Sequence, residues 1–498
     1  MRRRALTLVA VALLAGGCGT TVSTTATALN PGSETSSGGD TGPGVGSAPS
    51  SGNTAVAPGA VPGVVPGAGQ TTSGGVAPAT SGGATAGQIN STPSGGSAVV
   101  PGGPVQVGIV YESNLGAAFT SAGLQGASNA SDDQIKSWLT QIGKYINAHG
   151  GYAGHPIQLV MHGVDPSKGS FDQASQSACS DLAEDHKVVA AVVGANVYSA
   201  NLPTCLRQHG VPTVWNYQYL VDNATFRAFG PYLYQPAMIS ADRLGVVVDV
   251  LAKHDFFGSL AKVGLVRWDT PDAAYFTDKV LTPKLHAHGI TNITEFAAAA
   301  LQGESDAGRQ EAQMSNAVLR FRSQGVTNVI FSPTDTVAPW LFMTNAESQQ
   351  YRPKYGITSM DIPYFLEENA PPAQVANATG IGWNPEMDFP EPSKFPKNNP
   401  MQQLCLHINA AAGATNSASM LRYCDGLFFL QHAFTLAGAV LPTALADAVD
   451  RLGSSYRSAW SLTTDFAGGR HDGPSTVNYI SYDARCPCFR YGQPYHLG

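Results

Sequence analysis

VVAAVVGANVYSANLPTCLRQHGVPTVW, residues 188–215, contains the clearest local pattern in the chain. Its apolar run 188–193 is short enough for a strand, and apolar enough for one that is buried on both faces in a parallel sheet covered by helices. A polar loop follows, and then a predicted helix with Ser199 or Asn201 as its N-cap. Open α/β folds bind ligands where the carboxyl end of a parallel strand meets a helix N-terminus, and free N–H groups there suit an anion. Taken alone, the stretch also fits an ordinary strand–loop–helix unit without a ligand.

Strands and helices alternate along the rest of the chain from residue 104. Besides 188–193, the expected strands are 105–111, 157–161, 213–215, 262–267, 292–296, 326–331 and 355–358. Apolar helical faces lie between them, and this alternation predicts parallel sheets with helices on both faces, an α/β fold. About 395 residues are too many for one core, so we expect two doubly wound lobes that face each other across a ligand-binding cleft. A further strand at 380–383 and a hairpin-like tail at 462–491, with its turns at two Gly-containing pairs, complete the pattern.

The first 18 residues are expected to be a targeting segment. Three arginines precede the apolar run 5–15, and Cys18 follows small residues. This pattern resembles a bacterial lipoprotein signal, which implies that Cys18 is lipidated and anchors the protein to a membrane; the alternative is a plain secretory signal. Residues 19–103 consist mainly of Gly, Ser, Thr, Ala, Pro and Val, and they predict a disordered tether that carries the folded part away from the membrane.

The composition excludes several kinds of partner and activity. The net charge is −7 and no basic run follows the leader, so nucleic-acid binding is not expected. No apolar stretch of membrane-spanning length follows the leader either, so membrane contact is expected only through the lipid. The sequence has no G-x-S-x-G, HExxH or P-loop motif, and we predict neither an enzyme nor a cofactor.

Seven cysteines fit an exported protein. With Cys18 assigned to the lipid, six remain, and an even number in an oxidising compartment favours disulfides. Of fifteen possible connectivities, the most economical one is Cys179–Cys205, Cys405–Cys424 and Cys486–Cys488. The alternative is a metal site that joins some of these cysteines to His407, His471 or His496. No paired CxxC spacing supports that alternative, so no metal is expected.

Four segments resemble the type I periplasmic binding proteins, in particular the leucine/isoleucine/valine receptors that serve bacterial ABC importers. They are VGIVYESNLGAA at 107–118, INAHGGYAGHPIQLVMHGVD at 146–165, VVAAVVGANVYSANLP at 188–203 and FSPTDTVAPWLFMTNAESQQYRPKYGITS at 331–359. The INA-x-GG-x-x-G-x-P-I-x-L run is the most specific, and the order and spacing of all four agree with that family. The resemblance covers nearly all of the folded part.

This resemblance implies two lobes that close on a ligand by hinge motion. Lobe 1 would comprise residues 104–238 and 380–458, lobe 2 would comprise 239–379 and 459–498, and three crossovers would form the hinge. The family also carries a disulfide that brackets the central strand of lobe 1, which agrees with the pair Cys179–Cys205. The implied protein is a monomeric exported receptor that captures a small-molecule solute and delivers it to an ABC permease and ATPase complex.

The resemblance further implies which loops bind the ligand. In lobe 1 the binding residues would follow the first, third and fourth strands: Ser113, Asn114, Asn196, Tyr198, Ser199, Trp215, Asn216 and Tyr217. In the family these loops hold the α-carboxylate of an amino acid with hydroxyl and N–H groups. In lobe 2 the corresponding residues would be Asp269, Thr270, Thr334 and Asp335. In the family an acidic residue there meets the α-ammonium, and Asp335 is the first candidate because a buried ammonium needs a paired anion.

The ligand is expected to differ from leucine, isoleucine and valine. Aromatic residues occur at Tyr198 and within 215–219, where branched-chain receptors have hydroxyl-bearing and small residues. Such side chains favour an amino acid or a related amide or aromatic solute. The alternative function is a ligand sensor or an orphan surface lipoprotein of the same fold without a permease. An exported enzyme would be indicated by turnover of a bound ligand, and a structural wall protein by the lack of a deep cleft between the lobes.

Overall fold

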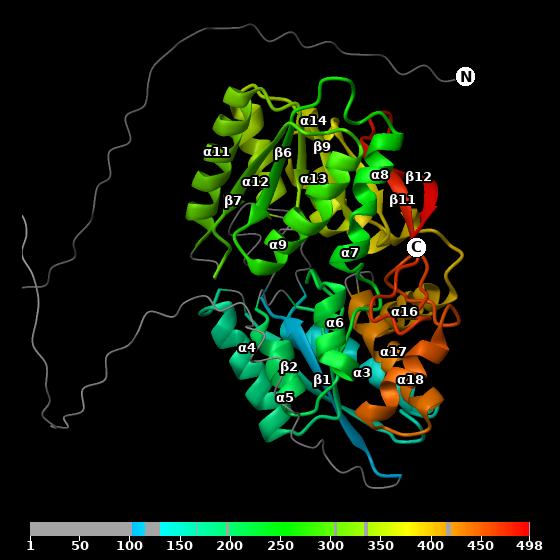
Figure 1. The fold of residues 1–498 in the computed structure, drawn as a ribbon. Helices are drawn as coiled ribbons and strands as arrows, with labels where there is room; N and C mark the ends of the chain where they lie inside the picture. The colour runs from blue at the N-terminus through cyan, green and yellow to red at the C-terminus, as the bar shows by residue number, and fades with distance from the viewer. Residues whose placement is uncertain are drawn as a thin grey trace, which may run out of the picture. The chain divides into compact units, whose positions relative to one another are not determined.

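The computed structural model describes residues 102–114, 130–165, 167–195, 199–302, 306–332, 337–414 and 420–497 (Figure 1). The leader, Cys18 and the tether up to residue 101 lie outside the described residues. The described chain forms two β-sheets, and helices pack on both faces of each. The prediction of an α/β fold with two doubly wound sheets is therefore confirmed.

The first sheet has five parallel strands in the order β2-β1-β3-β4-β5. They are β1 (Val105–Glu112), β2 (Ile157–Val164), β3 (Ala190–Val193), β4 (Thr213–Trp215) and β5 (Leu233–Tyr234). All four residues of β3 are fully buried. Burial on both sides explains the unbroken apolar run, because β3 lies at the centre of a sheet whose two faces are both covered.

Helices cover the two faces of this sheet in separate groups. A Cβ placed on Gly108 of β1 would lie 2.9 Å from Leu182, in the π-helical segment η1 (Ser180–Asp185). A Cβ placed on Gly426 would lie 2.5 Å from Val192, which points to the opposite face of the sheet. Alongside η1 lie α4 (Phe171–Cys179) and α5 (Asn201–Gln208), and the other face carries α3 (Asp132–Ala148), α16 (Pro400–Ala411) and α17 (Leu421–Ala437) (Figure 1). The remaining helices of this half are α6 (Asn223–Phe229), η2 (Gly230–Tyr232) and α18 (Pro442–Leu452).

The helices α3 and α4 begin with capping boxes. The hydroxyls of Ser131 and Ser170 accept the N–H groups of Gln134 and Gln173, and each glutamine side chain accepts the N–H of its serine. Among the described helices none alone has the length and apolarity to cross a membrane; α17 and α18, bent by 99°, meet that test only as a pair.

The second sheet has seven strands in the order β12-β11-β10-β9-β8-β6-β7. The parallel strands are β6 (Val263–Trp268), β7 (Ile293–Ala298), β8 (Asn328–Phe331), β9 (Lys354–Thr358) and β10 (Ala378–Gly382). An antiparallel hairpin, β11 (Thr476–Asp483) and β12 (Cys488–His496), extends the sheet beyond β10.

Two glycines show which helices cover the second sheet. A Cβ on Gly356 would lie 2.8 Å from Leu251 of α8 (Val246–Lys253), and a Cβ on Gly264 would lie 2.5 Å from Phe321 of α11 (Ala307–Gln324). The strand register places these two glycines on opposite faces, so α8 and α11 lie on opposite sides. The other helices here are α7 (Ala241–Leu244), α9 (Pro271–Tyr275), η3 (Phe276–Leu281), α10 (Thr282–Ala287), α12 (Val337–Ser348), η5 (Ser359–Asp361), α13 (Pro363–Asn369), α14 (Pro372–Val375), α15 (Pro385–Asp388) and η6 (Pro392–Lys394).

Two features of the chain differ from the predictions. Residue 380, where the sequence predicts a return to lobe 1, lies within β10 of the second sheet. Since β10 pairs with β9 on one side and with β11 on the other, it has no free edge for the first sheet. The C-terminal tail does form a hairpin, but its turn lies at 484–487 and not at the glycine pair 468–469, because β11 begins only at Thr476.

The chain crosses between the two sheets three times, at 235–240, 383–399 and 453–475. Hydrogen bonds join the three segments: Gln235 N–H to the His471 carbonyl (2.8 Å), Trp383 Nε1–H to the Ala237 carbonyl (3.0 Å), and Leu462 N–H to the Trp383 carbonyl (2.9 Å). These are the predicted three crossovers, bound to one another along the hinge.

A buried ion pair joins α7, the helix directly after the first crossing, to the third crossing. Arg243 Nη1 donates to Asp472 Oδ2 over 2.7 Å, and the two side chains are 11% and 2% exposed. The same Asp472 oxygen accepts the N–H of Ser240 at 2.9 Å. The hinge is therefore held by a charge-assisted contact that water hardly reaches.

Candidate functional site

Residues Ser113 and Asn114 follow β1, as predicted, and each donates a hydrogen bond to the end of β2 or the residue after it. The Ser113 N–H donates to the Val164 carbonyl at 2.9 Å, and Asn114 Nδ2 donates to Asp165 Oδ2 at 2.9 Å. Burial opposes ionisation of Asp165, but hydrogen bonds from Ser167 and Asn114 prevail and lower its pKa to about 2. The Asn114 side chain thus joins the ends of β1 and β2.

Ser199 follows β3 and serves the start of α5. Its hydroxyl donates to Asp172 Oδ1 (2.6 Å) and accepts the N–H of Asn201 (3.2 Å). Asn201 Nδ2 donates to the same carboxylate oxygen at 2.9 Å. The N-cap position itself is occupied by Ala200 without a side-chain cap, so the predicted choice of Ser199 or Asn201 is wrong. The neighbouring candidates Asn196 and Tyr198 lie outside the described residues.

Trp215 ends β4, Asn216 and Tyr217 follow it, and all three are buried. The Asn216 N–H donates to the Val193 carbonyl at 2.9 Å, and Asn216 Nδ2 donates to Asp425 Oδ2 (2.9 Å) and to the Arg422 carbonyl (3.0 Å). Asn216 Oδ1 and the indole N–H of Trp215 have no hydrogen-bond partner among the described residues. This segment therefore brings two unsatisfied buried polar atoms to the carboxyl edge of the first sheet.

Tyr217 belongs to a polar cluster that sequence reasoning missed. The guanidinium of Arg422 lies 4.7 Å from the centre of the Tyr217 ring, and Arg422 Nη2 pairs with Glu112 Oε2 at 3.0 Å. The Arg422 and Glu112 side chains are only 12% and 4% exposed. The Trp460 ring stacks beside Tyr217 at a centroid distance of 6.4 Å. We refer to Glu112, Tyr217, Glu386, Arg422 and Trp460 as the Arg422 cluster.

Glu386 of α15 brings a second carboxyl group to the Arg422 cluster. Burial raises the pKa of Glu386 to about 8, although Arg422 and Trp460 attract its charged form. Glu386 Oε2, Arg422 Nε and Trp460 Nε1 each lack a standard hydrogen bond within the described part of the chain. An unsatisfied buried polar atom costs about 1–3 kcal/mol, so a group of them suits a polar ligand or ordered water that would bind all of them.

The Arg422 cluster had little signal in the sequence. Glu112 and Arg422 are 310 positions apart, and Glu386 lies in the proline-rich stretch 385–400. A lone arginine at the start of the apolar helix α17 was the one available indication, because such a charge needs a partner when it is buried.

In the second sheet, Asp269 and Thr270 follow β6. The Asp269 N–H donates to the Ala298 carbonyl at 2.7 Å, while its side chain is 75% exposed and lies 3.6 Å from Arg267 Nη1. Thr270 is the N-cap residue of α9, without a side-chain cap hydrogen bond. Thr334 and Asp335, the other candidates of this lobe, lie outside the described residues.

Loops at the carboxyl ends of the two sheets contact each other. The Gln218 side-chain amide, after β4, donates to the Met360 carbonyl, after β9. The Phe171 N–H, at the start of α4, donates to the Gln302 carbonyl, after β7, at 3.0 Å. The two edges at which open α/β sheets bind ligands are therefore adjacent in this molecule.

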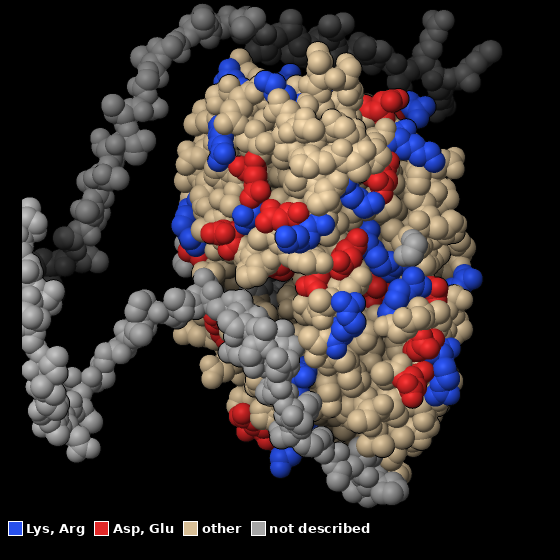
Figure 2. All heavy atoms as spheres, in the orientation of Figure 1, with Lys and Arg blue, Asp and Glu red and all other residues tan. Residues whose placement is uncertain are grey.

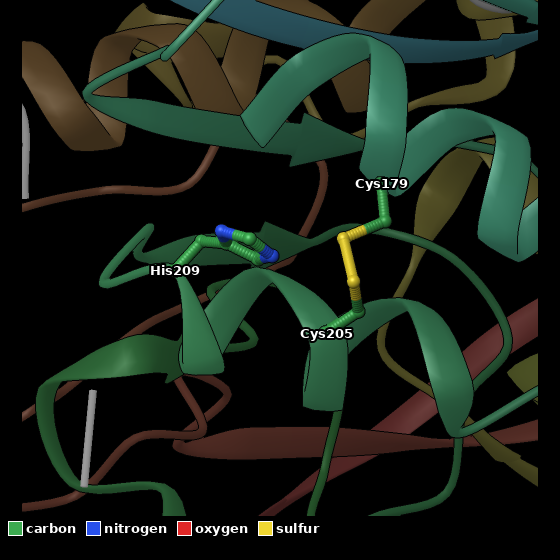
Figure 3. Close-up of side chains that lie close together, drawn as sticks. All are labelled: Cys179, Cys205 and His209. Atoms are coloured by element: carbon green, nitrogen blue, oxygen red, sulfur yellow. A yellow bond between two sulfur atoms is a disulfide. The ribbon is translucent and has the colours of Figure 1, made fainter. Parts of the chain in front are cut away.

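All three predicted disulfides are present: Cys179–Cys205, Cys405–Cys424 and Cys486–Cys488. His209 lies close to the first of them, and Figure 3 shows these three side chains together. The sulfur atoms are bonded to each other and are not thiolates, and His209 Nε2 lies 3.5 Å from Glu184 Oε1. This group therefore does not have the chemistry of a metal site.

Charged side chains of both signs are interspersed on the face drawn in Figure 2. Lys and Arg groups alternate there with Asp and Glu groups, and uncharged surface separates them. Phosphate backbones bind to clustered basic side chains, and this face has no such cluster among the residues shown in colour.

No protein-family model and no curated protein sequence matches the chain. Solved structures do match it. The extracellular ligand-binding receptor from Verminephrobacter eiseniae has a TM-score of 0.54 at 11% identity, over 78% of this chain and 100% of its own. The fatty acid ABC transporter substrate-binding protein from Thermomonospora curvata has a TM-score of 0.57 at 13% identity, over 81% and 95%. A branched chain amino acid ABC transporter protein from Thermus thermophilus with bound valine has a TM-score of 0.53 at 13% identity, over 79% and 97%.

These solved structures are type I periplasmic binding proteins, and the chain has their fold. They cover the described two-sheet part nearly end to end, so the resemblance noted in the sequence is confirmed at the level of the fold. At such low sequence identity, these structures show the fold but not the ligand. The ligand has to be inferred from the side chains of this chain's own site.

Proposed function

We propose that the protein is an extracytoplasmic receptor that captures a small solute between its two lobes. The observation that carries the proposal is the contact between the carboxyl edges of the two sheets, made by Gln218 and Met360. The Arg422 cluster, with its unsatisfied buried polar atoms, includes Tyr217, the residue directly before Gln218. Three hydrogen-bonded crossovers supply a hinge about which the lobes would close.

The proposed ligand is an amino acid or a related amide or aromatic solute. The Tyr217 and Trp460 rings lie together beside Arg422, where Arg422 would attract an anion and the largely protonated Glu386 would hydrogen-bond an amide. The solved neighbours are described as binding leucine, valine or fatty acid, which fits a solute with a carboxylate. Asp269 and the candidates outside the described residues remain proposed contacts from the second lobe.

Delivery to an ABC permease and ATPase complex is part of the proposal. Several neighbours are named as ABC transporter substrate-binding proteins, which supports an exported receptor of this kind. Lipidation of Cys18 and the tether 19–103 would hold such a receptor near its permease at the membrane. A sensor or orphan lipoprotein of the same fold is the second candidate, since the same cleft would serve it.

The experiment is a thermal-shift panel on the chain without its first 18 residues, after unfolding and refolding to remove bound ligand. Amino acids, amides, short peptides, nucleosides and sugars are compared. A ligand at a hundred times its dissociation constant adds about 2.7 kcal/mol to the free energy of unfolding, which raises the melting temperature measurably. A shift with one class supports the receptor, and no shift with any class would count against capture of these solutes.

Substitutions then locate the ligand. Glu386→Gln replaces the buried carboxyl group of the Arg422 cluster by an amide with little change in shape, and Asp269→Asn removes a carboxylate charge at the edge of the second sheet. Glu311→Gln on the exposed side of α11 is the matched control. The proposal expects the ligand-induced shift to shrink in Glu386→Gln or Asp269→Asn and to persist in Glu311→Gln. Equal shifts in all three variants would place the ligand elsewhere.

A further inference from the structure

The disulfide Cys486–Cys488 differs from the other two in the loop that it closes. Its cysteines are two positions apart, whereas the other pairs are 26 and 19 positions apart. It lies in the turn between β11 and β12, next to the exposed residue Pro487. A disulfide stabilises a protein mainly by closing a long loop in the unfolded chain, so a bridge over one residue adds little stability.

The bridge also holds Pro487 in an unusual conformation. Pro487 has a φ of +24°, but the pyrrolidine ring of a proline favours a φ near −65°. Residues with L chirality rarely adopt positive φ values, and such strain persists only when the surroundings impose it. Here the imposed constraint is the covalent ring that joins Cys486 to Cys488, so opening that ring would let the proline relax.

Two arginines lie close to the bridge in the sequence. Arg485 and Arg490 both pair with Asp483, at 2.8 and 2.9 Å, and the Arg485 side chain is 90% exposed. Arg485 directly precedes Cys486 and Arg490 follows Cys488 by two residues, so two cations lie near the bridge in the chain. Positive neighbours lower the pKa of a cysteine thiol, and a more acidic thiol leaves faster in disulfide exchange.

The two sulfur atoms differ in access. Cys486 is partly exposed, whereas Cys488 is buried at the start of β12. An attacking thiolate must approach along the axis of the S–S bond, so the exposed cysteine is the one that an external thiol can reach. Cys405 and Cys424 are both fully buried, which protects their bridge, whereas Cys179 is fully buried and its partner Cys205 is partly exposed.

We propose that Cys486–Cys488 is a thiol-exchange site, which opens in the folded protein when an extracytoplasmic dithiol protein reacts with it. The partner's thiolate attacks Cys486 Sγ, a mixed disulfide forms, and Cys488 leaves as a thiolate that takes a proton from water. The partner's second thiolate then attacks the partner's own sulfur and releases Cys486. Two electrons pass from the dithiol to the bridge, so the partner ends as a disulfide and the hairpin as a dithiol.

The fold is expected to survive this exchange. The β11–β12 ladder continues from Asp483 to Thr476, away from the bridge, and β11 also pairs with β10. At the bridge end, the Phe489 N–H donates to Glu367 Oε2 at 3.1 Å and ties β12 to α13. These contacts do not depend on the disulfide, so the exchange would change the turn alone. The site thus goes beyond solute capture, and its test does not depend on finding the solute.

The experiment compares the three bridges within one folded protein. The chain without its first 18 residues is incubated without denaturant in graded dithiothreitol, and separately with a reduced thioredoxin. Free thiols are trapped with iodoacetamide and counted by peptide mass spectrometry. Cys486–Cys488 should open at least about ten times faster than the other two, with a reduction potential higher by about 30 mV or more. Reduction of all three together, or of Cys486–Cys488 last, would overturn the proposal.

Two variants test the cause. Pro487→Gly accommodates a positive φ without strain, so its bridge should open several times more slowly than in the wild type. Arg485→Gln removes one cation and should slow the exchange without changing the fold. Circular dichroism of the reduced wild type checks that the sheet is intact. A bridge in Pro487→Gly that opens as fast as the wild-type bridge would contradict the role assigned to the proline.

Discussion

Replacing Asp472 with alanine should weaken the hinge more than any single surface change. The carboxylate accepts Arg243 Nη1 at 2.7 Å and the Ser240 N–H at 2.9 Å, and both members of the ion pair are nearly inaccessible to water. Removal of one partner leaves a buried guanidinium without a counter-charge. Breaking a buried pair in this way costs about 3–5 kcal/mol, because the remaining charge stays desolvated.

The assay is urea unfolding of the oxidised protein, followed by tryptophan fluorescence. The midpoint should fall in Asp472→Ala without a change in slope, because the surface exposed on unfolding stays similar. The double variant Arg243→Met with Asp472→Leu removes both charges and should be more stable than Asp472→Ala alone. This comparison separates loss of the pair from loss of packing.

The exposed pair Arg352–Glu347 supplies the control. Its removal in Arg352→Ala should change the midpoint far less, since water replaces an exposed partner at little cost. The reasoning is refuted if Asp472→Ala is no less stable than Arg352→Ala. It is also refuted if the double variant is less stable than Asp472→Ala, because the buried charge would then not be the cause.

Three further predictions concern the site and the hinge. Burial raises the pKa of Glu386 to about 8, so the folded protein keeps a proton that the unfolded chain releases above its ordinary pKa of 4.5. The free energy of unfolding should therefore fall as pH rises from about 5 to 8. Thermal melts of Glu386→Gln should show a flatter pH dependence. Asn216→Ala should lower the free energy of unfolding by about 1–3 kcal/mol in urea titrations, because it removes a donor from buried Asp425; an unchanged midpoint would argue against that contact. A Cβ on Gly473 would lie 2.1 Å from the Pro236 carbonyl oxygen. Gly473→Ala should therefore lower the free energy of unfolding by about 1–3 kcal/mol. A variant as stable as the wild type would show that the crossings are not closely packed.

The main course of the chain follows from local patterns. The apolar run at 188–193 predicts β3, and burial of every residue of β3 confirms it. The disulfides follow from counting cysteines in an exported chain and choosing the shortest loops. The strand can be predicted because its residues are neighbours in the sequence. The disulfides can be predicted because cysteines in an exported chain commonly pair with one another.

Pairing between distant segments was harder to predict. A strand near residue 380 is visible in the sequence, but its partners β9 and β11 decide which sheet it joins, and β11 lies about a hundred residues later. Ser199 is a plausible helix cap by residue type, but the N-cap position is Ala200, and the Ser199 hydroxyl accepts the Asn201 N–H from one position earlier. The hairpin turn was expected at two glycines, whereas the strands place it at the last two cysteines.

The candidate site, too, could be predicted only in part from the sequence. The carboxyl ends of the strands are predictable, and the structure places Ser113, Trp215 and Asn216 there. The Arg422 cluster is not predictable, because it joins β1, the segment after β4, α15 and α17 through side chains that carry no local pattern. Ion pairs of this kind depend on the tertiary fold, which a periodicity in the sequence does not encode.

Small-angle X-ray scattering of the refolded, ligand-free protein is the most direct test of the central claim, that a solute binds between two lobes and closes them. The class of solute that raises the melting temperature is added at saturation, and a class that does not is the control. The account predicts a smaller radius of gyration only with the first class, because hinge closure draws the lobes together. An unchanged radius of gyration with a solute that binds would contradict capture by closure.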